Sequence, residues 1–313
     1  MTTVLGKLKR WRASQANERG RTCEAEGRLP EAIEQYELAC ELDPGFSEPC
    51  YNLGLIFKYA GEWERSFEWN RQAARRNPQD QAGWWNLAIA ATALERWEVA
   101  REAWTAFGID LPPGEGPVDF PCGHSPIRLN PDTRGEVVWA NRIDPARAVI
   151  RSIPLPESGF RFRDLVLNDG APVGYRRVEG QEVPVFNCLQ LLAASAFSTF
   201  LAEVDLGEGS ECEEEVDRLL ELAADQGLAA ENWSTSLRVL CTACSEGRPH
   251  DHHDGLPLGQ QEEGAPQARP GRQRIGLAAR REDDALRLLA AWRGERTDLR
   301  LVSLEKVLAA EVM

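Results

Sequence analysis

The sequence predicts an α+β protein of several domains: an all-α repeat array, then a small β-rich module, then a sandwich of strands and helices. Three observations predict this order. Glycine, alanine and proline positions recur every 34 residues between residues 13 and 114, short strand-like runs replace this helical pattern after residue 118, and strands alternate with helices from residue 197. At 313 residues the chain is long enough for two or three domains.

Residues 13–114 form three consecutive units of a helix–turn–helix repeat, for which a period of about 34 residues is typical. The matched positions are Gly20 and Gly54, Gly27 and Gly61, Ala39 and Ala73, and Pro44, Pro78 and Pro112. A proline cannot continue a helix, so the three prolines close the units. The small residues Gly20, Gly54 and Ala88 let the first helix of each pair, helix A, approach the second, helix B. Residues 1–12 are a basic lead-in, expected to form a short helix or cap.

The repeated positions resemble the tetratricopeptide repeat (TPR). The family's small–large pattern is matched by Gly20, Gly27, Ala32, Tyr36, Ala39 and Pro44 in the first unit, by Leu53, Gly54, Phe57, Gly61, Ala73 and Pro78 in the second, and by Trp84, Leu87, Ala88, Ala100, Trp104 and Pro112 in the third. Ser66, Asn70 and Glu95 depart from the pattern; they replace an alanine, an aromatic residue and the turn glycine. The resemblance covers about one third of the chain and implies a curved right-handed solenoid that binds other proteins.

The resemblance also implies where a partner binds, because helix A lines the concave face of such a solenoid. The outward positions of helix A are Asn17, Arg21, Tyr51, Asn52, Leu55, Tyr59, Trp85, Asn86 and Ile89. In peptide-binding members an asparagine at the positions of Asn52 and Asn86 bonds the ligand backbone, since an amide offers both a donor and an acceptor. The cations that clamp a C-terminal carboxylate in chaperone-binding members are mostly missing, with Ala82 and Asn86 in their places. Alternatively, these residues pack against the C-terminal part of the chain.

Two β-containing modules are predicted after the linker Gly114–Pro117. Residues 118–190 are expected to form a small, mostly antiparallel β module, with strands at Glu136–Ala140, Ala148–Ile153, Asp164–Leu167 and Val183–Phe186. Residues 197–313 are expected to form a ferredoxin-like α+β sandwich, with strands at Phe197–Val204, Ser234–Cys241, Arg274–Ala278 and Leu299–Leu304 and helices at Glu213–Asp225 and Asp283–Trp292. The order strand, helix, strand, strand, helix, strand predicts that split arrangement.

One loop of the last module, residues 241–272, carries metal-ligand spacing and is expected to be partly disordered. Cys241 and Cys244 are separated by two residues, so both sulfurs can reach one tetrahedral ion, and His250, His252 and His253 follow six to nine residues after Cys244. This pattern predicts a Zn²⁺ site of a structural kind. The alternatives are that Cys241 simply ends a buried strand and that the histidines belong to a floppy loop, since the composition of residues 254–272 predicts disorder. The remaining cysteines are expected to be thiols, with Cys23, Cys40 and Cys50 as small buried hydrophobes.

Composition and charge narrow the function. The net charge of −14 argues against nucleic-acid binding, which depends on basic residues. No run approaches the ~18 apolar residues of a membrane-spanning helix, and no secretory signal is visible, so a cytoplasmic location without a membrane partner is expected. The excess of arginine over lysine and the abundance of alanine and glycine suggest a bacterial source.

These observations predict a non-enzymatic interaction protein, a TPR scaffold or adaptor that binds a protein partner. The acidity suits a basic partner, and an immunity protein or an inhibitor would fit that description. The alternative is a zinc-dependent enzyme with its site at Cys241, Cys244, His250 and His252, to which the repeats recruit substrate. None of the common nucleotide-binding or hydrolase motifs is present, and no catalytic residue is assigned. The oligomeric state is not predicted.

Overall fold

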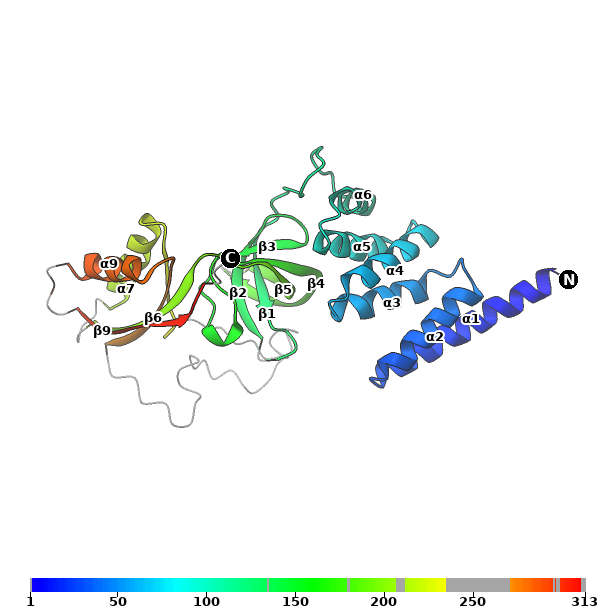
Figure 1. Ribbon diagram of the computed structural model, residues 1–313, viewed down its shortest axis with the longest axis horizontal. Helices are drawn as coiled ribbons and strands as arrows, with labels where there is room; N and C mark the ends of the chain where they lie inside the picture. The colour runs from blue at the N-terminus through cyan, green and yellow to red at the C-terminus, as the bar shows by residue number, and fades with distance from the viewer. Residues whose placement is uncertain are drawn as a thin grey trace. The chain divides into compact units, whose positions relative to one another are not determined.

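The computed structural model of the chain describes residues 2–133, 135–178, 181–206, 212–234, 271–294, 296 and 299–310. The chain divides into two compact units, Met1–Phe120 and Pro121–Met313. The first unit is helical, and the second holds a β-barrel followed by a sheet with helices, so the chain is α+β as the sequence predicts (Figure 1). None of the helices in these described ranges is long and apolar enough to cross a bilayer.

The first unit consists of helix pairs that follow one another along the chain. Its described helices are α1 (Thr2–Ala25), α2 (Leu29–Leu42), α3 (Glu48–Tyr59), α4 (Trp63–Arg76), α5 (Gln81–Ala93) and α6 (Trp97–Phe107). The closest packing joins α1 to α2, α3 to α4 and α5 to α6. These pairs are the repeats that the 34-residue spacing predicts, and the unit resembles a TPR array. The lead-in is not separate from the first repeat, because α1 runs unbroken from Thr2 and leaves Val4, Leu8 and Trp11 exposed.

Each helix pair contains one close approach between a small residue of helix A and a residue sixteen positions later in helix B. A Cβ atom added at Gly20 would lie 2.6 Å from the Tyr36 ring, and one added at Gly54 would lie 2.5 Å from the Asn70 side chain. The third unit has Ala88 and Trp104 at the same positions, and both are fully buried. The small residues therefore set the distance between the two helices, as the sequence predicts.

The turns between helix A and helix B share one backbone conformation in all three units. Gly27 has a φ angle of 74°, Gly61 of 71° and Glu95 of 56°. Glycine is the ordinary residue at such angles, because a Cβ atom makes positive φ unfavourable. Glu95 therefore holds a strained conformation that the repeat architecture imposes on it.

Replacing Glu95 by glycine is expected to raise the free energy of unfolding by about 0.5–1 kcal/mol. Left-handed strain costs a non-glycine residue about 1–2 kcal/mol, which exceeds the extra entropy that glycine loses on folding. Glu95 is exposed, so no packing is lost. The reverse change at the equivalent position, Gly61→Ala, should cost about 1 kcal/mol. Urea denaturation of both variants checks this, and a destabilised Glu95→Gly protein would contradict it.

Two thiols meet between the first and second repeats. The Sγ atoms of Cys40, near the end of α2, and Cys50, in α3, are 2.8 Å apart, and both side chains are buried. The hydrogen bond with Cys50 lowers the pKa of the Cys40 thiol, and the Arg76 guanidinium adds to this effect. The same bond, together with burial, raises the pKa of Cys50. Burial of these cysteines was expected from the sequence, but their contact was not.

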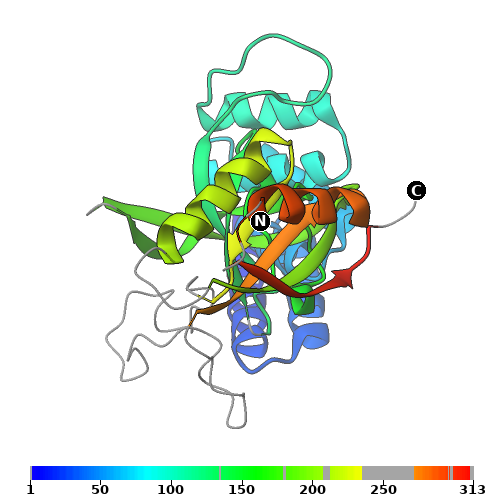
Figure 2. The same ribbon diagram turned by 90° about the vertical axis from the view of Figure 1, so that its left-hand side faces the viewer.

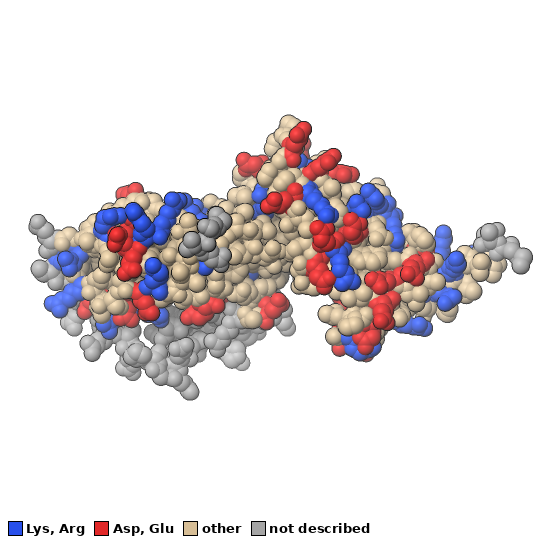
Figure 3. Space-filling model, viewed as in Figure 1, with Lys and Arg blue, Asp and Glu red and all other residues tan. Residues whose placement is uncertain are grey.

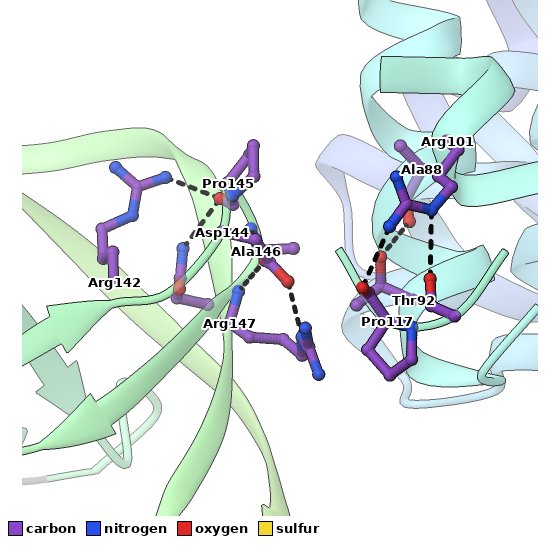
Figure 4. Close-up of polar contacts among 11 residues, drawn as sticks. Ala88, Thr92, Arg101, Pro117, Arg142, Asp144, Pro145, Ala146 and Arg147 are labelled. Carbon is purple, nitrogen blue, oxygen red and sulfur yellow. Dashed lines mark hydrogen bonds and ion pairs between the residues drawn. The ribbon is translucent and has the colours of Figure 1, made fainter. Parts of the chain in front are cut away.

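The segment that follows α6 is hydrogen-bonded to Arg101, a side chain of that helix. The Arg101 guanidinium donates to the carbonyl oxygens of Pro112 at 2.9 Å and Gly116 at 3.0 Å. It also donates to the carbonyl oxygen of Pro117 at 3.1 Å (Figure 4). One side chain thus supplies the donors for carbonyl groups of a segment that forms no helix or strand.

The second unit begins with a closed barrel of β1 (Gly123–Leu129), β2 (Glu136–Arg142), β3 (Arg147–Ile150), β4 (Leu165–Val178) and β5 (Gln181–Ala193). Successive strands pair antiparallel, and the barrel closes by a parallel pairing of β1 with β5 at Ile127 and Phe186. Five strands in an up-and-down order leave the first and the last pointing the same way, so closure has to be parallel. The core contains Ile127, Leu129, Val138, Ile150 and Val166.

A buried ion pair fixes the loop between β2 and β3. The Asp144 carboxylate accepts the backbone N–H groups of Ala146 at 2.8 Å and Arg147 at 2.6 Å, and the Arg147 guanidinium at 2.5 Å (Figure 4). Asp144 is fully buried. A buried carboxylate is tolerated here because several donors compensate for the water that it has lost.

The described residues of the rest of the second unit form a four-stranded sheet with two helices. In chain order the elements are β6 (Ser198–Asp205), α7 (Cys212–Asp225), β7 (Ala229–Asn232), β8 (Arg272–Ala279), α9 (Glu282–Arg293) and β9 (Arg300–Leu308). The strands lie in the order β7-β8-β6-β9, and all neighbours are antiparallel. Figures 1 and 2 show α7 and α9 on the same face of this sheet. Their apolar sides cover alternate residues of β6, namely Phe200, Ala202 and Val204.

The opposite face of the sheet packs against the loop that leads from β3 to β4. Ile153 and Phe162 from this loop form one apolar cluster with Phe197 and Trp233. The Trp233 indole donates to the Ile153 carbonyl oxygen at 3.1 Å, and the Ile153 N–H donates to Glu231 at 2.7 Å. Barrel and sheet thus share a core.

The strand predicted at Ser234–Cys241 is corrected at its start, because Ser234 lies in a turn and β7 ends at Asn232. Residues 235–241 lie outside the described part of the chain. The strand that follows α7 is Ala229–Asn232, which has no β-branched residue and is recognised only through its pairing with β8.

Candidate functional site on helix A of the repeats

The predicted partner-binding residues lie on α1, α3 and α5, the helix A of each repeat, but they differ in accessibility. Arg21 and Tyr59 are exposed, and Tyr51, Asn52, Leu55 and Trp85 are partly buried. Asn17, Asn86 and Ile89 are buried. The nine residues therefore do not form one continuous accessible surface.

Ile89 and Asn86 correct the expectation that both face outward. Ile89 is fully buried, and Asn86 is 5% exposed. The physical reason is that α5 is apolar on nearly all sides: Gly83 and every residue from 86 to 92 are buried. A helix of this composition has no wide polar face from which an exposed side could be deduced.

The side-chain amide of Asn86 is also engaged within the first unit, through its oxygen and one N–H group. Its Oδ1 accepts from the Lys58 ammonium at 2.9 Å, and its Nδ2 donates to the Ala82 carbonyl oxygen at 3.0 Å. The Lys58 ammonium lies 4.4 Å from the centre of the Tyr59 ring. Lys58 itself is 3% exposed. Lys58 was not among the residues predicted from the sequence. The only indication in the sequence was that it directly precedes Tyr59, which was predicted.

A chain of amide contacts joins α1 to α3. The Asn17 side chain donates to the Glu48 carboxylate at 3.0 Å, and the Asn52 side chain donates to Asn17 Oδ1 at 3.4 Å. The second contact is near the outer limit for a hydrogen bond. Asn17, which is 2% exposed, acts as a link between helices and presents little surface to a ligand.

Asn52 differs from the other two asparagines because part of its amide is unused. It is partly exposed, and no donor among the described residues reaches its side-chain oxygen. One of its two N–H groups makes the long contact with Asn17. Leu55 and Tyr59 follow Asn52 at helical spacing, and Tyr51 is its neighbour. We call Tyr51, Asn52, Leu55 and Tyr59 the α3 face.

Trp85 takes part in packing within its own repeat. Its ring meets Trp104 edge to face at a centroid distance of 4.8 Å and Phe107 at 4.6 Å. Trp104 is fully buried, so this cluster belongs to the core between α5 and α6. Trp85 is thus held rigidly, with part of its side chain accessible.

The predicted metal ligands cannot be placed. Cys241, Cys244, His250, His252 and His253 all lie outside the described residues. Within the described ranges, no group of three or more His, Cys, Asp or Glu side chains is arranged to hold a metal ion. The zinc site therefore stays a prediction.

No protein-family model matches the chain, and the comparison with curated proteins returns no match. Among solved structures, the chain is similar to the second TPR domain of Spaghetti (RPAP3), solved with an HSP90 peptide, at 18% identity over 34% of this chain and 91% of that one, with a TM-score of 0.32. The C-terminal TPR-containing domain of a putative FK506-binding protein from Plasmodium falciparum is 14% identical over 33% of this chain and 78% of its own, with a TM-score of 0.30. A hypothetical protein from Neisseria gonorrhoeae is 12% identical over 61% of this chain and 96% of its own, with a TM-score of 0.24.

Proposed function

We propose that this chain is a non-enzymatic interaction protein whose repeat unit binds a protein partner at the α3 face. The observation that carries this proposal is the amide of Asn52, which keeps an acceptor and a donor available beside Leu55 and the exposed ring of Tyr59. An amide that offers both groups matches the two polar groups of a peptide bond. The exposed Val4, Leu8 and Trp11 of α1 add support, because apolar side chains left in water often mark interaction surfaces.

The ligand that fits this face is an extended segment rather than a chain terminus. Asn52 would pair with one peptide group while Leu55 and Tyr59 contact apolar side chains of the partner. The side-chain oxygen of Asn86 accepts from Lys58 and the residue is 5% exposed, so of Asn52 and Asn86 only Asn52 is accessible for main-chain recognition. Binding through one amide and a small apolar patch should be moderate in affinity.

The proposal also covers the charge of the partner, the fold of the second unit's sheet and a zinc site. The partner is basic, which the net charge of −14 favours, and an immunity protein or an inhibitor would be of this kind. The sheet of the second unit is a ferredoxin-like sandwich, which its strand order β7-β8-β6-β9 and its two helices on one face support. The loop with Cys241 and Cys244 binds structural zinc, which metal analysis of the purified protein would test.

Asn52→Ala is expected to weaken partner binding about tenfold. The variant loses a hydrogen bond between uncharged groups and leaves the partner's peptide group without its bond, which together reduce the binding free energy by about 1–1.5 kcal/mol. The matched control is Glu34→Ala, an exposed position on α2 whose side chain makes no ion pair or hydrogen bond with the described residues. Both variants should fold normally, since neither side chain belongs to the core.

The measurement is quantitative capture from a lysate of the host cell, followed by titration of the purified captured protein. A partner retained by the wild type and Glu34→Ala but reduced with Asn52→Ala supports the proposal. A partner that all three proteins retain equally shows that binding occurs elsewhere. If the partner is basic, capture should also weaken as the salt concentration rises.

A further inference from the structure

A cavity of about 410 Å³ opens in the second unit, where the start of β6 and α9 meet the loop between β3 and β4, residues 151–164, which we call the barrel loop. Its lining includes Arg163, Phe197, Gln226, Arg280, Asp284 and Arg287. Three of these side chains are cationic, in a protein whose net charge is −14. Figure 3 shows Lys and Arg side chains gathered near α7 and α9 of this unit. The volume lies within the range of small-molecule sites, about 300–1,000 Å³.

Two of the arginines are held against one aromatic ring. The guanidinium carbons of Arg163 and Arg280 lie 5.4 and 5.5 Å from the centre of the Phe197 ring. Phe197 is 4% exposed and meets Phe162 edge to face at 5.2 Å, so the ring is fixed in the core. Stacking of this kind orients a guanidinium without using its N–H donors.

Neither Arg163 nor Arg280 has a carboxylate partner among the described residues. Arg287, in contrast, is paired with Asp284, which also accepts from Arg281 at 3.3 Å. Asp284, the one acidic side chain among the described lining residues, is therefore already balanced by two arginines. The two arginines that stack on Phe197 come from different elements, Arg163 from the loop between β3 and β4 and Arg280 from the residue after β8, and both side chains are exposed at the opening of the cavity.

Arg163 is presented by a strained turn. Its φ angle is 67°, which is unfavourable for a residue with a Cβ atom. The turn is enforced by Asp164, whose carboxylate accepts the N–H groups of Arg161 and Ser195, each at 2.7 Å. Burial raises the pKa of Asp164, and these hydrogen bonds partly offset the effect. Strain of this sort is retained where the surroundings impose it, often at binding sites.

We propose that this cavity binds a small phosphorylated molecule and that Arg163 and Arg280 hold its phosphate group. A phosphate group carries about −1.5 to −2 charges at neutral pH and three acceptor oxygens, which match two unpaired guanidinium groups. A single carboxylate would leave one arginine without a counter-charge. The cavity is larger than a bare ion requires, so the remainder of the molecule would lie toward Gln226 and Leu228. This site is separate from the α3 face and does not depend on the function proposed for it.

The test is calorimetric titration of the full chain at constant ionic strength with three probes: inorganic phosphate, glycerol 3-phosphate and acetate. Both phosphates should bind with one site per chain, with the ester at least as tight as the free ion, and acetate should bind much more weakly. The double variant Arg163→Gln/Arg280→Gln should lose about tenfold or more in affinity for both phosphates, as expected for charged hydrogen bonds. Binding of free phosphate but not of the ester would overturn the assignment of a phosphorylated molecule.

The control is Arg274→Gln/Arg293→Gln, which removes the same charge at two exposed positions outside the cavity lining. It should change the affinity less than about twofold, since exposed charges that do not line the cavity are screened by salt. The absence of phosphate binding, or an equal loss in both double variants, would overturn the proposal. Arg163→Gly separates binding from folding: it should bind phosphate more weakly while unfolding no more easily than the wild type, because glycine accepts the turn without strain.

Discussion

Trp292→Ala is expected to lower the free energy of unfolding of the second unit by about 3–5 kcal/mol, the usual cost of removing a buried tryptophan. Trp292 is 1% exposed and lies in the core between the sheet and its helices, with Leu219, Leu288 and Ile275 in the same cluster. Its indole N–H donates to the Glu215 carbonyl oxygen at 2.9 Å and so ties α9 to α7. The alanine variant loses the packing and also the hydrogen bond that joins the two helices, although the Glu215 carbonyl oxygen keeps its donor within α7.

Two variants distinguish the contributions of Trp292. Trp292→Phe keeps an aromatic ring but no N–H donor, so it should cost less than the alanine change. Leu286→Ala, on the exposed side of the same helix at 43% exposure, should cost less than about 0.5 kcal/mol. Because the chain has two units, hydrogen exchange of the β6 and β8 amides is the appropriate measurement. Protection unchanged in Trp292→Ala would contradict this description of the core.

The second large effect is expected at Gly54, where alanine should destabilise the first unit by about 1–3 kcal/mol, the cost of overpacking. The added Cβ atom would lie 2.5 Å from three atoms of Asn70, which is fully buried and hydrogen-bonded to Ser66. Asn70 cannot move aside without losing those bonds. Helix propensity alone would favour alanine by about 1 kcal/mol, so the sign of the effect tests the close approach.

Gly83→Ala is the matched control for Gly54→Ala. Gly83 also lies in a helix A, but an added Cβ atom would meet its nearest neighbour at an ordinary 3.5 Å. This change should be neutral or stabilising by up to about 1 kcal/mol. The double variant Gly54→Ala/Asn70→Ala should recover much of the lost stability, because it makes room for the added methyl group. Urea denaturation with equal losses for Gly54→Ala and Gly83→Ala would contradict the predicted role of Gly54.

The repeat unit could be predicted from the sequence because its constraints recur. Gly20 and Gly54 sit at equivalent close approaches, and Gly27 and Gly61 at equivalent turns. The need for a small residue at the close approach and for a glycine at the turn therefore recurs along the sequence, which makes the repeat recognisable. Glu95 shows the limit of this reasoning, since its residue type departs from the pattern while its backbone does not.

The second unit was less predictable because its structure depends on distant pairings. The parallel closure of the barrel joins Ile127 to Phe186, and β7 is a strand only through its bonds to β8. The local sequence predicts neither the parallel pairing of β1 with β5 nor the strand β7. Ile89 was expected to face outward because each helix A was assumed to have one exposed side. Helix α5 is buried on nearly all sides, so this assumption fails there.

The arginine-lined cavity could not be anticipated from any motif. Arg163, Phe197 and Arg280 are far apart in the sequence, and only the packing of the barrel loop against the sheet brings them together. Asn52, in contrast, was found from its place in the repeat, and the structure distinguishes it from Asn17 and Asn86 by its unused hydrogen-bonding groups. Cytoplasmic location, a basic partner and the zinc site stay predictions.

Site-specific photo-crosslinking tests the central claim most directly. A benzophenone amino acid replaces Leu55 in the α3 face in one protein and Glu34 on α2 in another, and both are irradiated in the host cell. The proposed function predicts that the Leu55 probe forms a covalent adduct with one specific protein and that the Glu34 probe does not. Equal adducts from both positions, or none from Leu55 while the partner is still captured, would contradict binding at the α3 face.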